Sequence, residues 1–223
     1  ESWPEDDSFD ERILADREMN PEGFARWADQ QTSTRDGIVF SQEQGVRCDF
    51  YRAGNGLHQR WLEIRREYQP VRDRLSRIFN PKHCRLLKLE RDTFTPERTA
   101  HVIANSPMVK AEILRLTSYP EDRISVITNG VDLERFRSGN RARGREIMEV
   151  TEKDFLVLLV GRGAFRKGHR FARKLEQTMQ GEIALRIIDS PPACPMEDIY
   201  AAADVFYLPT LYDPFSNATL EAM

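Results

Sequence analysis

Two segments near the end of this 223-residue chain carry residue types that could bind a phosphorylated ligand. The first runs from Gly161 to Gly168, where glycines are interspersed with cations. Glycines let a backbone approach an anion closely, and the start of a following helix favours negative charge. Arg162, Arg166 and Lys167 add positive charge, so this stretch favours a phosphate group. Its glycine spacing matches neither the Walker nor the dinucleotide fingerprint, and an ordinary cationic surface loop explains it about equally well.

The second segment carries two carboxylates, Asp213 and Glu221, eight positions apart. Asp213 is expected just before a helix begins, and Glu221 about two turns into that helix. Carboxylates can accept paired hydrogen bonds from sugar hydroxyls. The amides near Ser216, Asn217 and Ala218 would be free at the helix start and could receive a diphosphate. A capping role for Asp213 and a solvated Glu221 would explain the same residues without any ligand, and composition alone favours that explanation.

Two runs of alternating strands and helices indicate the elements that must position these segments. Short apolar runs predict strands at 38–40, 48–52, 101–104 and 124–127 in the first run, and at 155–160, 183–188 and 205–208 in the second. Strands that alternate with helices predict parallel sheets with crossover helices. The polar, turn-rich stretch 133–144 between the two runs is predicted to be a linker.

Helical periodicity is clearest at 57–78, where apolar residues recur at steps of four and three. Pro70 falls inside this pattern and is expected to kink or split the helix. Ser106 can cap another helix that has Pro107 at its first position. Shorter helices are predicted at 21–30, from about 81, from about 169, at 196–202 and from about 215.

Composition indicates a folded protein without a metal centre or a membrane span. Hydrophobic residues make up 40% and charged residues 31% of the chain, as is typical of soluble proteins, and no apolar run is long enough to cross a bilayer. Cys48, Cys84 and Cys194 lie far apart, and the four histidines form no metal motif. Reduced cysteines in a cytosolic protein are therefore expected. The net charge of −3 is uneven, because 1–16 is acidic and 60–98 is basic.

Four segments, in this order along the chain, resemble the family 4 glycosyltransferases of the two-lobed GT-B fold. They are FYRAGNGLH (50–58), VIANSPMVK (102–110) with ITNGVD (127–132), VGRGAFRKG (160–168), and ADVFYLPT (203–210) running into DPFSNATLEAM (213–223). The segment 50–58 is similar to the branch that builds the core of lipopolysaccharide. The similarity covers most of the chain after about Gly37.

The resemblance implies an α/β fold with two Rossmann-like parallel-sheet lobes, both incomplete at their outer ends. Residues 1–132 would form part of an acceptor-binding lobe, and residues 133–223 part of a nucleotide-sugar-binding lobe. A truncated sheet would expose unpaired edges, so this segment alone is expected to be poorly soluble. The implied activity is retaining transfer of a hexose from a nucleotide diphosphate sugar, with no cofactor and no metal.

The resemblance also implies roles for the phosphate-binding segments. Arg162 or Arg166, together with Lys167, would hold the donor diphosphate and stabilise its charge as it leaves. Amides of three helix-start residues would meet the phosphates: Ser216, Asn217 and Ala218. Glu221 would hold the ribose of the nucleotide.

Two positions depart from the family pattern. Asp213 would contact the donor sugar as a catalytic residue, but this position is usually Glu, which is longer by one methylene. The position of Asn55 is commonly Asp, proposed to act on the acceptor hydroxyl, and an amide cannot take up a proton at neutral pH. Three explanations stay open: His58 serves instead, the acceptor is held differently, or activity is impaired. A structural or acceptor-binding role is favoured for His58 over that of a base.

The expected partners are a nucleotide sugar and a glycan or lipid-linked acceptor in lipopolysaccharide or cell-envelope polysaccharide synthesis. The basic stretch 60–98 fits a peripheral contact with an anionic inner membrane surface, but it fits a solvated helix face equally well. Aromatic residues for stacking on bases are sparse there, so no nucleic-acid partner is expected. A truncated relative that only binds, and an unrelated α/β phosphate-binding protein, are the competing hypotheses.

Overall fold

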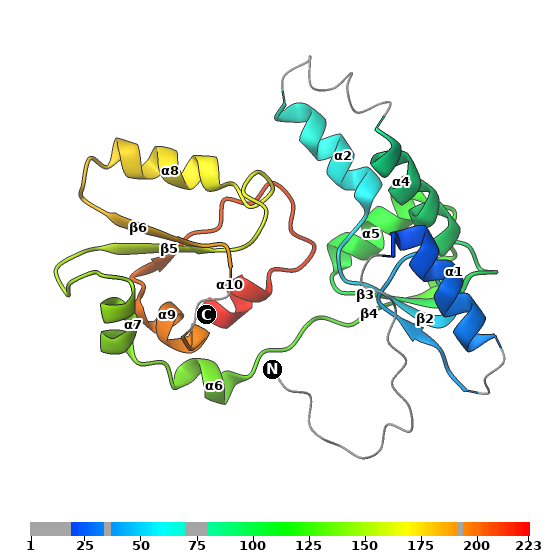
Figure 1. The fold of residues 1–223 in the computed structure, drawn as a ribbon, viewed down its shortest axis with the longest axis horizontal. Coiled ribbons are helices and arrows are strands. Elements are labelled where there is room, and N and C mark those ends of the chain that lie inside the picture. Colours follow the sequence, from blue (N-terminus) through cyan, green and yellow to red (C-terminus); the bar gives the residue numbers. More distant parts are fainter. Residues whose placement is uncertain (1–18, 34–36, 70–79, 191–193) are drawn as a thin grey trace.

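The computed structural model describes residues 19–33, 37–69, 80–190 and 194–223. These residues form two lobes, each built on a parallel sheet with helices packed against it (Figure 1). In the first lobe the sheet order is β1-β2-β3-β4, with bounds Phe40–Ser41, Cys48–Ala53, Thr99–Ala104 and Ile124–Val126. In the second lobe the order is β6-β5-β7, with bounds Ala184–Ile188, Leu156–Val160 and Val205–Phe206. The predicted α/β fold of two parallel-sheet lobes is confirmed.

The first lobe is held together by a core between its sheet and helix α5 (Pro107–Leu116). Val102 and Ala104 of β3 are fully buried beside Val109 and Ile113 of α5. The start of α5 follows the prediction, because Ser106 accepts a hydrogen bond from the Val109 amide at 3.2 Å and Pro107 opens the helix. The other described helices of this lobe are α1 (Pro21–Thr32), α2 (His58–Glu67), α4 (Pro81–Thr93) and the 3-10 turn η1 (Glu121–Arg123).

The second lobe is centred on β5, which is buried on both faces. Leu156 and Leu158 pack into the cluster that contains helix α9 (Met196–Ala202), whereas Val157 and Leu159 pack against Ala172 of helix α8 (His169–Thr178). Successive side chains of a strand point to opposite faces, so a continuous apolar run is what a central strand between two helical layers requires. The predicted strand 155–160 and helix 196–202 are therefore confirmed.

One prediction for the first lobe needs correction. The segment 38–40 was expected to be a buried strand, but β1 begins at Phe40, and Ile38 and Phe40 are 76% and 52% exposed. The reason is that β1 pairs on one side only, with β2, and Val39 alone of this triplet packs on the core. The described part of the helix predicted at 57–78 is α2, which begins at His58 and ends at Glu67. The rest of that prediction, with the expected kink or split at Pro70, and the acidic stretch 1–16 lie outside the described residues.

The predicted linker 133–144 is also wrong, because this stretch forms helix α6 (Leu133–Arg137) and the first part of helix α7 (Arg141–Ile147). Both helices pack on α9 of the second lobe. Gly139 and Gly144 permit this packing, since a Cβ at either position would come within 2.9 Å of an alanine Cβ of α9. The glycines that suggested a flexible linker are thus sites of close helix contact. The predicted strand 205–208 is shorter than expected and ends at Phe206.

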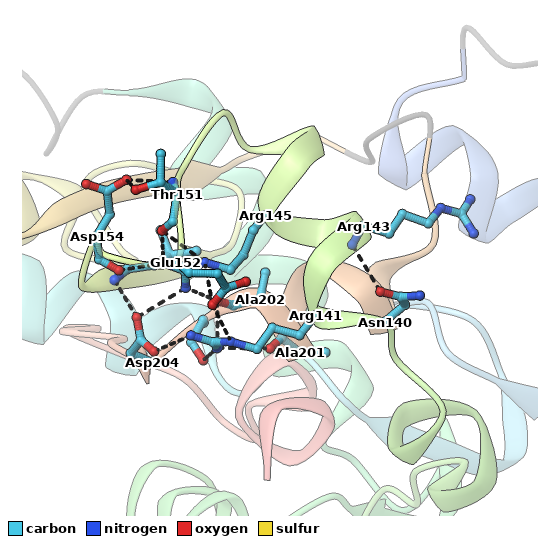
Figure 2. Close-up of polar contacts among 12 residues, drawn as sticks. Asn140, Arg141, Arg143, Arg145, Thr151, Glu152, Asp154, Ala201, Ala202 and Asp204 are labelled. Carbon is cyan, nitrogen blue, oxygen red and sulfur yellow. Dashed lines mark hydrogen bonds and ion pairs between the residues drawn. The ribbon is translucent and has the colours of Figure 1, made fainter.

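Arg145 of α7 is the most deeply buried charge in the second lobe, with 2% of its side chain exposed. Its guanidinium donates to the carbonyl oxygens of Ala202 and Thr151, and pairs with the Asp204 carboxylate at 3.3 Å. Asp204 also accepts the Leu156 amide at the start of β5, at 2.7 Å. Figure 2 shows these contacts converging, so that one buried arginine joins α7, the end of α9 and the amino end of the sheet.

We expect Arg145→Ala to lower the free energy of unfolding by about 3–5 kcal/mol, because it leaves buried acceptors without their donor. Arg145→Lys keeps the charge but not the forked geometry, so its loss should be smaller. Urea unfolding followed by circular dichroism measures both. Arg137→Ala, which removes an exposed arginine of α6, serves as control and should change the value by less than about 0.5 kcal/mol. Equal losses in the Arg137 and Arg145 variants would contradict this role.

Candidate active site between the two lobes

A cavity of about 690 Å³ lies where the loops after β1 and β2 meet the second lobe. The first lobe contributes Asn55, His58 and Trp61 to its lining, and the second lobe contributes Arg166 and Tyr212. In sheets of parallel strands, ligands bind at the carboxyl ends of the strands. The structure therefore brings three of the predicted site residues, Asn55, His58 and Arg166, to one cavity at the expected edge.

Asn55 also lines a second cavity of about 750 Å³, together with Arg52 and Asn129 of the first lobe and Asn217 of the second. The Arg52 guanidinium donates to the Asn129 amide oxygen, and the Asn129 Nδ2 donates to Asn217 Oδ1 at 2.6 Å. This chain of polar contacts crosses between the lobes. Asn55 itself is exposed in the turn after β2. A ligand in either cavity could therefore reach it.

His58 is half-buried, and one of its ring nitrogens is engaged with another histidine. Its Nε2 lies 3.0 Å from His83 Nδ1 of α4. Burial, followed by the charges of His83, Arg65 and Lys82, lowers the pKa of His58 from 6.5 to about 4. The ring is therefore neutral at pH 7. A group with this pKa is a weak base. It is also poorly suited to general base catalysis, which is most efficient when the pKa of the base lies near the working pH.

A buried carboxylate holds the start of α2 and thereby the position of His58. Glu90 of α4 accepts the His58 amide with one oxygen and the Gln59 amide at 3.0 Å with the other. These amides have no acceptor within their own helix, and no side chain of residue 57 caps them. Burial raises the pKa of Glu90 against the lowering effect of these two amides. Glu90 thus acts as a cap from a distant segment.

The loop 161–168 is fastened to the loop that follows β7. The Arg166 carbonyl accepts the Leu211 amide at 2.8 Å, and the Lys167 ammonium pairs with the Asp213 carboxylate. Only 11% of each of these two charged side chains is exposed. The sequence assigned Lys167 and Asp213 to different parts of a donor, whereas the structure joins them to each other. Arg162, in contrast, is exposed.

The last helix, α10 (Asn217–Ala222), carries the remaining predicted residues. Ser216 caps it by accepting the Thr219 amide at 3.1 Å, so its hydroxyl is already in use. The amides of Asn217 and Ala218 are at the first two positions of the helix, where no intrahelical acceptor exists. Glu221 accepts a hydrogen bond of 2.8 Å from the hydroxyl of Tyr200 on α9. It does not line either of the two cavities that contain Asn55.

Several residues of the site gave no signal in the sequence. Tyr212, Trp61, Glu112 and Glu90 all shape the first cavity or hold its loops, yet each contacts a segment far away in the chain. The described residues contain no group of three or more histidine, cysteine or acidic side chains placed to hold a metal ion. Within the same residues, no helix is both long and apolar enough to span a bilayer.

Comparison with known proteins gives these loops a context. Residues 56–135 match the sequence profile of Glycosyltransferase Family 4. An uncharacterized glycosyltransferase of Methanocaldococcus jannaschii, MJ1607, is 24% identical over 156 residues, which cover 56% of this chain and 40% of that protein. Over these residues the chain is therefore similar to the family 4 glycosyltransferases. D-inositol 3-phosphate glycosyltransferase 2 of Catenulispora acidiphila is 36% identical over 61 residues, covering 27% of this chain and 14% of that enzyme.

Two solved structures share the fold. WaaG, described as a glycosyltransferase involved in lipopolysaccharide biosynthesis, superposes with a TM-score of 0.68 at 17% identity over 95% of this chain and 64% of its own. Sucrose-phosphate synthase of Thermosynechococcus elongatus gives 0.53 at 18% identity over 78% and 47%. The chain thus spans less than two thirds of each of these relatives. The predicted resemblance to family 4 glycosyltransferases is confirmed, together with the GT-B type of fold.

The lowered pKa of His58 predicts a loss of stability in acid. Its folded-state pKa, about 4, lies below the ordinary 6.5, so its contribution is complete above pH 6.5 and is lost as the pH falls towards 4. From pH 7 to pH 4.5 we expect wild type to lose roughly 1–2 kcal/mol more than His58→Gln. Urea unfolding at the two pH values measures this difference. A histidine ring titration by NMR with a midpoint near 6.5 for His58 would contradict it.

Proposed function

We propose that this chain belongs to a retaining glycosyltransferase that moves a hexose from a nucleotide diphosphate sugar to a glycan or lipid-linked acceptor. The observation that supports it most is the shared cavity, which is lined by Asn55 and His58 of one lobe and by Arg166 of the other. In this proposal residues 1–132 belong to the acceptor-binding lobe and residues 133–223 to the donor-binding lobe. A transfer reaction needs both substrates held in one water-poor space, and a cavity between two lobes meets that need.

On the donor side, Arg166 and Arg162 would hold the diphosphate, helped by the amides at 216–218. Glu221 would accept hydroxyls of the ribose, and Asp213 a hydroxyl of the sugar. The main catalytic effect would be stabilisation of the charge that develops on the leaving diphosphate. No cofactor or metal is proposed. Lys167 would act through Asp213, because the two are already paired.

On the acceptor side, neither Asn55 nor His58 is a strong base at neutral pH. Asn55 has an amide in place of a carboxylate, and the pKa of His58 is about 4. Both would therefore orient the acceptor by hydrogen bonds. This feature also favours a second candidate function, a relative that binds nucleotide sugar without turning it over. The similarity of the fold to WaaG supports a role in lipopolysaccharide or other cell-envelope polysaccharide synthesis. We propose the cytoplasmic side of the membrane as the place of this role.

Arg166→Ala tests the donor site with little risk to the fold, because the loop is fastened through the Arg166 carbonyl and not through its side chain. We expect the affinity for UDP, ADP or GDP, whichever wild type binds, to fall about tenfold, as for loss of one charge-assisted contact. Isothermal titration calorimetry measures this. Arg173→Ala, on the exposed face of α8, is the matched control.

Release of nucleotide diphosphate from a nucleotide sugar distinguishes the two candidate functions in the same protein. Turnover by wild type supports the transferase, whereas tight binding with no release supports the non-catalytic relative. Unchanged affinity in both the Arg166→Ala and Glu221→Gln variants would contradict the proposed donor site altogether.

We also propose that helix α4 lies against an anionic membrane surface during this reaction. Arg60 and Arg98 of the basic stretch are paired with acids, Arg60 with Glu63 at 3.1 Å and Arg98 with Asp29. The cations of α4 are instead exposed: Lys82, Arg85, Lys88 and Arg91. An apolar recess of about 250 Å³ beside Leu86 and Leu89 adjoins two of them. Each cation near an anionic surface contributes about 1 kcal/mol of binding.

The triple change Lys82→Gln, Arg85→Gln, Lys88→Gln should weaken binding to phosphatidylserine-containing vesicles by about a hundredfold, at about 1 kcal/mol per cation. Vesicle co-sedimentation at low salt measures this, with neutral vesicles as reference. The control carries the same number of changes at exposed cations elsewhere: Arg123→Gln, Arg137→Gln and Lys153→Gln. Equal binding of wild type to neutral and anionic vesicles, or equal loss in both triple variants, would exclude the α4 surface.

A further inference from the structure

Tyr212 belongs to the second lobe but is buried in contacts with the first, with only 4% of its surface exposed. Its hydroxyl donates to Glu112 Oε2 at 2.6 Å and accepts the Leu57 amide at 3.0 Å. Its ring stacks on Trp61 of α2, with centroids 6.4 Å apart and planes inclined by 15°. Three elements of the first lobe therefore meet one side chain of the second.

The charge of Glu112 fixes the direction of this hydrogen bond. Glu112 is nearly buried and pairs through its other oxygen with Arg60 Nε at 3.4 Å. Burial, and then the hydrogen bond to this carboxylate, raise the pKa of Tyr212. The phenol therefore keeps its proton and remains the donor. A hydrogen bond to a charged group contributes more than a neutral one, which makes this contact the strongest described link at the position.

The backbone on the other side of Tyr212 leaves no room for a side chain. Gly56 has a φ of +66°, and a Cβ there would overlap the Tyr212 hydroxyl and come within 2.6 Å of Pro214 Cγ. Ser106 donates to the Pro214 carbonyl at 2.7 Å. The segment from Tyr212 to Pro214 is thus fitted between the turn after β2 and the start of α5.

We infer that Tyr212 is a positioning residue that couples the donor and acceptor sites of the proposed glycosyltransferase. Asp213, which pairs with Lys167, follows Tyr212 directly, and Asn55 and His58 flank the Gly56–Leu57 backbone on which Tyr212 rests. Moving this one side chain would shift both loops relative to each other. The assignment of donor and acceptor sites rests on the proposed function, but the joining of the two loops is a property of the fold alone.

Tyr212→Phe tests the inference, because it removes one hydroxyl and keeps the ring on Trp61. Gly56→Ala attacks the same contact from the opposite side, and Glu112→Gln keeps an acceptor while removing its charge. Tyr207→Phe is the matched control, since Tyr207 lies in the same lobe and packs against the Val157 and Leu159 cluster.

The distance between the lobes can be measured with two dyes. One is attached to the exposed Cys84 of α4 and the other to Lys174→Cys of α8, in a Cys194→Ser background.

We expect Tyr212→Phe and Gly56→Ala to broaden and lengthen the distance distribution from single-molecule energy transfer, Glu112→Gln to do so less, and Tyr207→Phe to leave it unchanged. The affinity for the nucleotide diphosphate that wild type binds should fall at least fivefold in Tyr212→Phe, in the range typical of coupling between sites. In a transfer assay the acceptor KM should rise more than kcat falls.

Two results separate this inference from the proposed function. If wild type binds no nucleotide diphosphate but the distance changes as expected, the proposed function fails and the joining of the loops stands. If the distance distribution of Tyr212→Phe and Gly56→Ala equals that of wild type, the positioning role is overturned whatever the binding shows. If Glu112→Gln binds the nucleotide diphosphate as tightly as wild type does, Tyr212 needs a hydrogen-bond acceptor at position 112 but not its negative charge.

Discussion

The packing of Tyr212 on the backbone of Gly56 is the contact on which the geometry of the candidate site depends. Gly56 follows β2 in the first lobe and Tyr212 follows β7 in the second, so the contact joins the carboxyl edges of two parallel sheets. Loops at such edges are the usual place for ligands. Because the edges meet here, Leu57 and Tyr212, which are 155 positions apart in the sequence, are joined by one hydrogen bond. The cavity lined by Asn55 and Arg166 is a consequence of that meeting.

Buried charge has a different use at each end of the second sheet. At the start of β5, Arg145 and Asp204 satisfy backbone groups of α9 and of the strand itself, so the charges fasten the lobe. After the end of the same strand, Lys167 and Asp213 join two loops that carry candidate ligand-binding groups. Arg145 and Asp204 are thus already engaged with each other and with backbone groups. The stabilising edge and the binding edge are therefore separated by the length of one strand.

Local sequence signals predicted the elements whose surroundings are uniform. Residues 156–160 are apolar throughout and form the buried β5, and Ser106 with Pro107 begins α5 as expected. The misses have tertiary causes. Ile38 and Phe40 were expected to be buried, but β1 is an edge strand that pairs only with β2, and both side chains are exposed. The glycines of 133–144 resemble a linker in sequence, although they are the positions where two helices approach α9 most closely.

The same distinction applies to the site. Arg166 could be named from sequence because it lies in a loop of glycines and cations, whereas Asn55 and His58 were named through the resemblance of their segment to a known family. Glu90, Glu112 and Tyr212 could not, because their importance comes from partners in distant segments: Glu90 caps α2 from α4, and Tyr212 reaches Glu112 across the lobes. No spacing in the chain encodes such a partner. Sequence reasoning thus predicted groups that would face a ligand, and the structure adds residues that hold their loops in place.

The Lys167–Asp213 pair offers a reason why Asp213 can stand at a position where the family pattern usually has the longer Glu. An aspartate carboxylate lies closer to its own backbone by one methylene, so it reaches less far towards a ligand. Its Oδ2 is held by the Lys167 ammonium, and the backbone beside it is held by Tyr212 and by Pro214. A carboxylate has lone pairs beyond those that one ammonium uses, so in the proposed donor site Asp213 would still be able to accept a sugar hydroxyl. There, a fixed orientation would offset the shorter reach as long as the two loops remain joined.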